Sequence, residues 1–259
     1  MGSVNQMIKN PTERFSDRVE NYVRYRPSYP DGVVDTLIER CQLPGDSTVA
    51  DIGAGTGIFT RQLLDRGLRV VAVEPNKEMR RAAEASLSGY ERFTCGDGIA
   101  EATGLPGNSV DLVVAAQAFH WFRHSETQAE FRRILRADGW VALVWNQRKI
   151  QQSFLQDYDA LLRHHAPEYR TSNHMNLPDS VIAGFFDSAL LETYSFENAQ
   201  HFDKSSFLGR MQSSSYTPAP GSLEHTGLIE AAEVLFAKHE IAGQVRFEYD
   251  TRLFIGKMG

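Results

Sequence analysis

The sequence has very little cysteine. Its 259 residues include only two cysteines, Cys41 and Cys95, so neither a disulfide framework nor a four-thiolate metal site is available. This usage is typical of a reducing compartment, and we expect a cytoplasmic protein. His120 and His124 have the spacing of one helix face, but no acid or thiolate nearby completes a ligand set. We therefore expect no metal ion.

Long apolar runs are also missing. Stretches such as Leu112 to Ala116 and Val141 to Trp145 have the length of a strand. A membrane-spanning helix needs about 20 apolar residues. The first residues lack the apolar stretch of a signal peptide. We therefore expect no membrane partner.

An excess of basic charge is absent as well. Lys and Arg number 27 against 33 Asp and Glu, which gives a formal net charge of −6. Proteins that bind nucleic acid usually carry a basic patch or stripe, so we expect no nucleic-acid partner. Hydrophobic residues make up 42% of the chain, which is enough for a folded core.

Short apolar runs alternate with helical patterns between about Thr48 and Gln147. Strands are predicted at 49–52, 70–73, 92–95, 110–116 and 140–145. Compact apolar runs of this kind indicate strands that are buried on both faces. Strands that alternate with amphipathic helices predict an α/β fold, a doubly wound Rossmann-like sheet.

The parts on either side of this core are less regular. Residues 1–47 are predicted to form an N-terminal lid and a first helix. Residues 148–259 are predicted to form a helical substrate cover and the final strands of the same sheet. Within that part, helices are expected near 153–165, 179–186, 205–212 and 223–241, and strands near 190–196 and 245–257. No clean linker separates the parts, so we expect a single integrated domain.

Three alternating glycines follow the first predicted strand, in the segment Asp51-Ile52-Gly53-Ala54-Gly55-Thr56-Gly57. Glycines permit a tight turn and let a ligand approach the backbone N–H groups at the start of a helix. A ligand bound there lies at the carboxyl edge of the sheet. The alternative is a turn without a ligand.

Two acids stand at the ends of the next two strands. Glu74 lies 21 positions after Gly53 and can accept hydrogen bonds from both hydroxyls of a ribose. Its alternative role is to cap the helix that starts near Asn76. Asp97, in Gly96-Asp97-Gly98, can accept from the exocyclic amine of adenine, or it simply belongs to an Asp-Gly turn. Together the two acids favour a ligand that contains adenosine.

The glycine spacing distinguishes between the cofactors that contain adenosine. The dinucleotide fingerprint needs Gly or Ala at its sixth position, where this chain has Ile58, and no Lys follows to make a phosphate loop. A G-x-G-x-G loop with Asp51 before it suits a smaller ligand that has an amino-acid tail and no pyrophosphate. A nicotinamide-dependent oxidoreductase and a non-catalytic binding protein remain the alternatives.

These segments resemble the class I S-adenosylmethionine-dependent methyltransferases, in particular the small-molecule group (methyltransferase type 11) that includes trans-aconitate and ubiquinone-pathway methyltransferases. The match lies in Asp51 to Gly57, Glu74 and Gly96 to Gly98, with 108–113 and 135–140 entering strands four and five. The resemblance implies a seven-stranded sheet with an antiparallel last strand. It also implies S-adenosylmethionine as cofactor, S-adenosylhomocysteine as product, and 48–147 as the cofactor-binding core. The implied cofactor-binding residues are Asp51, Gly53, Ala54, Gly55, Glu74, Pro75, Met79, Asp97, Gly98 and Gln117.

The segment from Gln117 to Phe122 is expected to lie beside the transferring methyl group. His120 is the best-placed general base, although a base is needed only if the nucleophile carries a proton of high pKa. Its alternative role is to hydrogen-bond the loop. Trp121 is expected to shape the substrate pocket.

The segment from Tyr22 to Pro30 is rich in tyrosine and arginine and is predicted to fold over the site as a lid. Tyr22 and Arg26 would then bind substrate, with Arg26 paired to a carboxylate. The alternative is a surface helix. We expect residues 150–211 to roof a small-molecule acceptor. The similarity to carboxylate methyltransferases indicates an anionic acceptor that Arg26, Arg148 or Arg210 would select.

Overall fold

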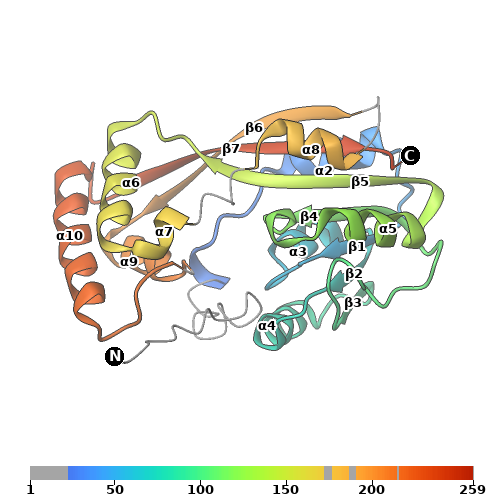
Figure 1. Ribbon diagram of the computed structural model, residues 1–259, viewed down its shortest axis with the longest axis horizontal. Coiled ribbons are helices and arrows are strands. Elements are labelled where there is room, and N and C mark those ends of the chain that lie inside the picture. Colours follow the sequence, from blue (N-terminus) through green and yellow to red (C-terminus); the bar gives the residue numbers. More distant parts are fainter. Residues whose placement is uncertain (1–22, 172–176, 187–190, 215, 259) are drawn as a thin grey trace, which may run out of the picture.

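The computed structural model describes residues 23–171, 177–186, 191–214 and 216–258, which contain one seven-stranded sheet. The strand order is β3-β2-β1-β4-β5-β7-β6 (Figure 1). The strands are β1 Thr48–Ile52, β2 Arg69–Val73, β3 Phe93–Gly96, β4 Val110–Ala116, β5 Leu135–Arg148, β6 Glu192–Phe202 and β7 Val245–Gly256. The first five are parallel, and β7 inserts antiparallel between β5 and β6. The predicted doubly wound sheet with an antiparallel last strand is confirmed.

Helices cover both faces of the sheet. They are α2 Asp31–Arg40, α3 Ile58–Asp65, α4 Lys77–Leu87, α5 His124–Ile134, α6 Ser153–His165, α7 Pro167–Thr171, α8 Asp179–Phe186, α9 Lys204–Gln212 and α10 Leu223–His239. A short 3₁₀ turn, η3, spans Phe119–Trp121. All of the helices predicted in the second half of the chain are present, within a few residues of the expected bounds.

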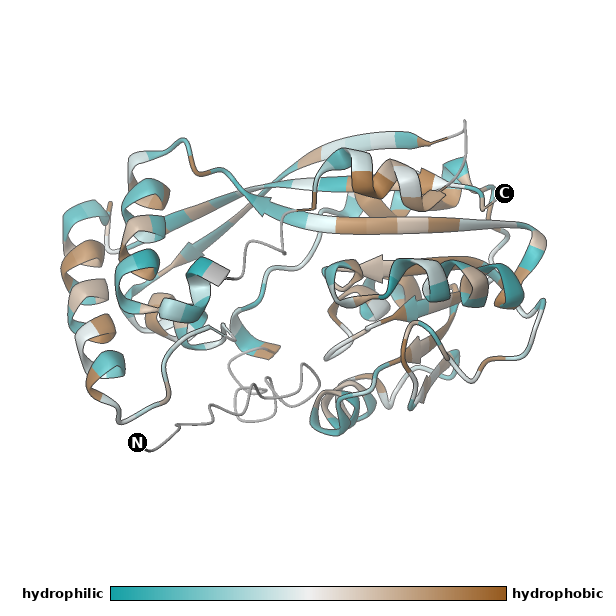
Figure 2. Ribbon diagram, viewed as in Figure 1, coloured by the Kyte–Doolittle hydropathy of each residue, from teal (hydrophilic) through white to brown (hydrophobic). Residues whose placement is uncertain are grey.

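Two buried clusters lie on opposite faces of the parallel strands. Leu112 and Val114 of β4 pack in one cluster, together with α2 and α3, whereas Val113 packs in the other, with α5 and α8. This alternation follows from the two-residue period of a strand. Much of the β5 ribbon is apolar where it crosses the core (Figure 2). The central strands are therefore buried on both faces, as their compact apolar runs predict.

The antiparallel half of the sheet extends beyond the parallel core. β5 begins five residues earlier and ends three residues later than the predicted 140–145, and the pairing of β6 with β7 continues to Phe202 and Val245. Figure 1 shows α6, α7, α9 and α10 gathered around these extended ends. They share a third buried cluster that includes Phe247 and Tyr249 of β7. The cover is thus joined to the core by the sheet itself.

Candidate functional site

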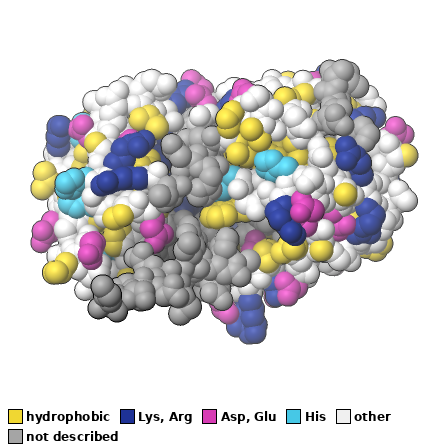
Figure 3. Space-filling view, in the orientation of Figure 1, with side chains coloured by type: hydrophobic (Ala, Val, Ile, Leu, Met, Phe, Trp, Pro, Cys, Tyr) yellow, Lys and Arg dark blue, Asp and Glu magenta, His cyan; other side chains and the backbone are white. Residues whose placement is uncertain are grey.

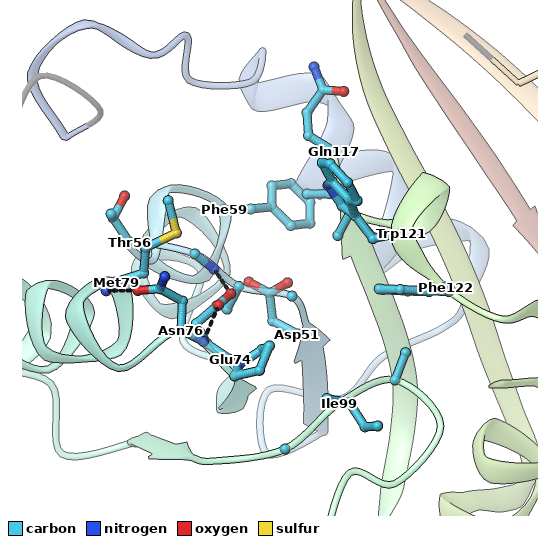
Figure 4. A pocket seen from close by; sticks show the side chains of 18 of the residues that line it. Asp51, Thr56, Phe59, Glu74, Asn76, Met79, Ile99, Gln117, Trp121 and Phe122 are labelled. Atoms are coloured by element: carbon cyan, nitrogen blue, oxygen red, sulfur yellow. Dashed lines mark hydrogen bonds between the residues drawn. The ribbon is translucent and has the colours of Figure 1, made fainter. Parts of the chain in front are cut away.

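A cavity of about 360 Å³ lies at the carboxyl ends of β1, β2 and β4 (Figure 4). Its walls come from the glycine loop after β1 and from the loops that follow β2, β3 and β4. Parallel strands end at one edge of a sheet, so these loops meet there although they are far apart in the sequence. The cavity occupies the edge at which a ligand is predicted to bind.

The glycine loop lies directly against the loop after β4. Gly53 has a φ of +71°, and a Cβ built on it would lie 2.6 Å from the Cβ of Ala118. Both the backbone conformation and the close approach exclude a side chain at this position. Gly55, two residues on, has a φ of +58° and directs its N–H toward the end of β2. The loop thereby brings backbone donors to the cavity floor.

Glu74 lies on the cavity floor and is 6% exposed. Its Oε2 accepts a hydrogen bond from the Gly55 N–H at 2.8 Å, and its Oε1 accepts from the Asn76 N–H at 2.8 Å (Figure 4). Burial raises the pKa of Glu74, and these two N–H donors oppose that rise. Each carboxylate oxygen can accept one more hydrogen bond. The helix-capping role belongs instead to Asn76, whose Oδ1 accepts from the Glu78 and Met79 N–H groups.

Asp51 lies beside Glu74 and is 1% exposed. Burial raises its pKa from 3.8 to about 7, against the effect of Thr60, whose hydroxyl donates to Oδ2 at 2.6 Å. The other oxygen, Oδ1, is buried and has no hydrogen-bond partner among the residues described. The hydroxyl of Thr56, also in the cavity wall, is likewise buried and has no hydrogen-bond partner among the residues described. Buried polar atoms are almost always satisfied in folded proteins, so both call for a polar ligand.

Apolar side chains form the rest of the wall. Met79 is 4% exposed and approaches the glycine loop, since its Sδ lies 3.9 Å from a Cβ built on Gly55. Tyr29 packs edge-on against Phe59 with ring centroids 5.0 Å apart. A flat apolar wall opposite two carboxylates suits a ligand with one aromatic and one polar part.

Most of the residues implied by the resemblance come together in this cavity. Its lining includes Asp51, Gly53, Ala54, Gly55, Glu74, Pro75, Met79, Gly98, Gln117 and Trp121. It also includes Tyr29, Thr56, Asn76 and Phe59, which the sequence analysis did not select as site residues. Asn76 stands directly before a predicted helix, which is a usable signal for its capping role. Tyr29 lies in the predicted lid segment and Thr56 in the glycine loop, whereas no local pattern marks Phe59.

Three selected residues lie away from the cavity walls. The Asp97 side chain is 73% exposed and pairs with Arg80 at 3.3 Å, because the turn after β3 presents its backbone rather than its carboxylate to the cavity. Arg26 donates to the Ser213 carbonyl at 3.0 Å. His120 sits between the buried Phe119 and the cavity-lining Trp121, and successive residues of a 3₁₀ turn point in different directions. Tyr22 lies outside the described residues.

A second cavity of about 160 Å³ adjoins the first at Gln117, which lines both. Gln117 has a φ of +56°; its backbone N–H donates to the Val144 carbonyl at 2.8 Å and its Nε2 to the Asn146 carbonyl at 3.1 Å. Arg148 and Tyr169 lie in the wall of this second cavity. The cover therefore supplies part of the wall of a second space, which shares Gln117 with the first cavity.

Residues 50–143 match the model of a family described as a methyltransferase domain. An uncharacterized methyltransferase of Mycobacterium tuberculosis (strain ATCC 25618 / H37Rv) is 38% identical over 148 residues, which cover 57% of this chain and 58% of that protein. An uncharacterized methyltransferase-like protein of Schizosaccharomyces pombe is 32% identical over 60% of this chain and 61% of its own length. The chain thus matches about three fifths of the curated relatives' length.

Among solved structures, a putative methyltransferase from an antibiotic biosynthesis pathway of Anabaena variabilis superposes with a TM-score of 0.63, 25% identity, and coverage of 90% of this chain and 98% of that one. A putative type II methyltransferase from Anaeromyxobacter dehalogenans gives a TM-score of 0.64 with 24% identity and the same coverage. Residues 50–143 are therefore similar to a methyltransferase domain, and the chain has the Rossmann-like fold of the methyltransferases.

No helix in the described ranges is both long and apolar enough to span a membrane. Within the same ranges, no three histidine, cysteine or acidic side chains are grouped closely enough to hold a metal ion.

Proposed function

We propose that this protein catalyses methyl transfer from S-adenosylmethionine to a small-molecule acceptor. The observation that carries the proposal is the orphaned carboxylate oxygen of Asp51 in a cavity that also contains Glu74. An ammonium group would satisfy Asp51, and a pair of ribose hydroxyls would satisfy the remaining acceptor capacity of Glu74. A nucleoside with an amino-acid tail has both groups.

The residues present fit this cofactor. Glu74 would accept from the ribose hydroxyls, and Met79 would lie against the adenine ring. Asp51 and the N–H groups of the glycine loop would hold the amino-acid end. Asp97 would have to reach the exocyclic amine from the rim, since its side chain is exposed. A nicotinamide dinucleotide would need a pyrophosphate subsite, and a buried carboxylate at the end of β1 repels such a group.

The bound cofactor would supply an electrophilic methyl group on a sulfonium. The chain's own contribution is to bind, to align and to exclude water. Trp121 and Phe122 line the cavity near Gln117, where the second cavity begins, and aromatic side chains there keep the space dry. Holding donor and acceptor in line supplies much of the rate in a displacement of this kind.

We further propose that the methylated group is a carboxylate. The support is the resemblance to carboxylate methyltransferases and the position of His120 away from the cavity walls. A carboxylate is already ionised at neutral pH, so it needs no general base. His120 would become necessary for an acceptor such as a phenol or an amine.

A small acceptor is supported by the size of the second cavity, about 160 Å³, and by the surface charge. On the side shown in Figure 3, basic and acidic side chains of the described residues are interspersed rather than separated into patches. Two free thiols, Cys41 and Cys95, support a reducing compartment such as the cytoplasm.

Calorimetric titration tests the cofactor first. We expect S-adenosylmethionine and S-adenosylhomocysteine to bind and NAD not to bind. A transfer assay with a labelled methyl donor then compares small carboxylic acids with their amides. Labelled ester products would support a carboxylate acceptor. Tight NAD binding without binding of either sulfur nucleoside would refute the proposal, and binding without transfer to any acceptor would favour a non-catalytic binding protein.

A further inference from the structure

Arginine and tyrosine side chains from several elements lie together beneath the helical cover. We call Arg148, Arg210, Tyr158, Tyr169 and Tyr216 the arginine–tyrosine cluster. Arg148 ends β5, Tyr158 lies in α6, Tyr169 in α7 and Arg210 in α9, with Tyr216 in the loop that follows α9. Figure 1 shows the three helices grouped beside the far end of β5. No local sequence pattern joins these positions.

Arg210 is buried and lacks an acidic partner. It is 5% exposed, and no carboxylate in the described parts of the chain lies within 4 Å of its guanidinium. Its Nη1 donates to the Ser214 hydroxyl at 3.4 Å, and its Nε is buried without a hydrogen-bond partner among the residues that the structure describes. A buried charge normally has a counter-charge, because losing hydration is costly. The free donor and the uncompensated charge both call for an anion.

Arg148 adds a second positive charge. It donates to the Tyr169 hydroxyl at 3.0 Å, and its guanidinium lies 5.4 Å from the centre of the Tyr158 ring. The acid nearest to this group, Asp159, is already engaged by Arg163 at 2.6 Å and by the Tyr169 hydroxyl. Arg148 therefore has aromatic and hydroxyl neighbours, and no ion pair within the described residues.

The pKa of Tyr216 reflects the resulting positive potential. Burial disfavours the phenolate of Tyr216, yet Arg148 and Arg210 hold its pKa below the ordinary value. The hydroxyl of Tyr158 is buried without a partner in the described chain. Two guanidiniums that both act on Tyr158 and Tyr216, together with an unused hydroxyl, form a receptor for a small oxyanion.

Two residues of the cluster lie in the wall of the predicted acceptor space. Arg148 and Tyr169 line the second cavity, which meets the cofactor cavity at Gln117. Arg148 stands four residues beyond Val144, the β5 residue that binds the Gln117 N–H, and four strand residues span about 13 Å. Arg148 is also two residues beyond Asn146, whose carbonyl accepts from the Gln117 Nε2, so an anion held by the cluster would lie farther along β5 than the residue that both cavities share.

We propose that the arginine–tyrosine cluster binds an oxyanion group of the methyl acceptor that is separate from the group that is methylated. This inference rests on the proposed function, since it assumes that the second cavity receives the acceptor. It assigns the acceptor class as small molecules with a carboxylate or phosphate at one end and the nucleophile at the other. Binding energy at that remote end would orient the reacting end.

The test measures anion binding to the full chain saturated with S-adenosylhomocysteine. Succinate, its uncharged diamide and inorganic phosphate are titrated by calorimetry into the wild type, Arg210→Met and Arg69→Met. Arg69 is an exposed arginine at the amino end of β2, on the opposite edge of the sheet, and serves as the matched control. Preference for succinate or for phosphate distinguishes carboxylate acceptors from phosphorylated ones.

We expect the wild type to bind at least one anion, with the diamide at least tenfold weaker. Arg210→Met should weaken that anion at least tenfold, leave the affinity for S-adenosylhomocysteine within twofold, and raise the melting temperature of the unliganded protein. The rise is expected because the substitution removes an unpaired buried charge. Arg69→Met should change none of the three. Arg148→Gln provides a second variant with the same expected loss of anion binding.

Each other outcome is informative. Unchanged anion binding in Arg210→Met and Arg148→Gln overturns the proposal, as does a wild type that binds neither anion. A parallel loss of S-adenosylhomocysteine affinity also overturns it, because the cluster would then hold the cofactor's own carboxylate. A lower melting temperature with unchanged anion binding would make the cluster purely structural. Failure of S-adenosylhomocysteine to bind the wild type, with arginine-dependent anion binding retained, would refute the proposed function and leave the anion receptor standing.

Discussion

The affinity for S-adenosylhomocysteine is expected to rise with pH up to about 7 and then to level off, because of Asp51. Burial raises the pKa of this carboxyl to about 7 in the unliganded protein. A ligand ammonium at Oδ1 would favour the ionised form, so binding below that pKa must first release a proton. With a pKa of about 7, the ionised fraction is about 3% at pH 5.5 and about three quarters at pH 7.5. We expect affinity to increase about 25-fold over that interval.

The same group sets an opposite trend for the stability of the unliganded protein. The folded pKa of Asp51 is raised above the unfolded value of 3.8, so its contribution to stability is fully present below pH 4. That contribution is lost as the pH rises toward 7, and a shift of about three pKa units corresponds to roughly 4 kcal/mol. The melting temperature should therefore fall in this range by more in the wild type than in Asp51→Asn.

Calorimetry at pH 5.5, 6.5, 7.5 and 8.5, in buffers with different ionisation enthalpies, measures both the affinity and the number of protons released. Asp51→Asn is nearly isosteric and keeps an acceptor for the Thr60 hydroxyl, so it should fold. We expect it to bind S-adenosylhomocysteine more weakly at pH 7.5 and with a flatter pH profile. A pH-independent wild type, or a variant that retains the full slope, would refute the reasoning about Asp51.

Four further substitutions and one control are predicted. Glu74→Gln should weaken the binding of S-adenosylhomocysteine about 10- to 150-fold, as measured by titration. The amide would place an N–H donor against one of two backbone N–H groups, and it would lose the negative charge that faces the ribose. An unchanged dissociation constant would exclude the ribose role. Gly53→Ala should lower the free energy of unfolding by about 1–3 kcal/mol in denaturant titrations, since φ is +71° and the new Cβ would lie 2.6 Å from the Cβ of Ala118. Gly45→Ala is the control and should change the stability little, because there is open space around Gly45. Trp121→Ala should raise KM for the acceptor, whereas His120→Ala should leave kcat nearly unchanged for a carboxylate acceptor; a large loss of kcat with an altered pH profile would instead identify His120 as a base.

The core of the fold and much of the cavity follow from local patterns. The central strands are compact apolar runs of four to seven residues, and the helices between them have an apolar stripe, so both can be recognised in short windows. The glycine loop is equally local, since positive φ angles and close backbone approach restrict those positions to glycine. Glu74 follows from its place at the end of β2. These features can be recognised from residues that are neighbours in the sequence.

Local sequence patterns did not predict the direction of every side chain, because that direction depends on the surrounding residues. The segment around His120 is placed correctly beside the cavity, but the turn of η3 buries Phe119 and presents Trp121 instead. Asp97 lies at the predicted strand end, yet an ion pair with Arg80 holds its carboxylate outside. The lid segment reaches the cavity through Tyr29, while Arg26 bonds the Ser213 carbonyl. Tertiary packing therefore determines which side chains face the cavity.

The alternation of strands and helices and the ligand edge could be recognised from the sequence, because apolar runs, glycine placement and strand-end acids are properties of adjacent residues. The antiparallel last strand followed only from the resemblance to a known family. The raised pKa of Asp51 could not, since it depends on burial by segments from the whole core. The arginine–tyrosine cluster could not either. Arg148 and Arg210 are 62 positions apart, and only the extension of β5 to β7 and the packing of α6 and α9 on it bring their charges together. Long-range packing, which no short window contains, therefore decided that Arg148 and Arg210 lie close together.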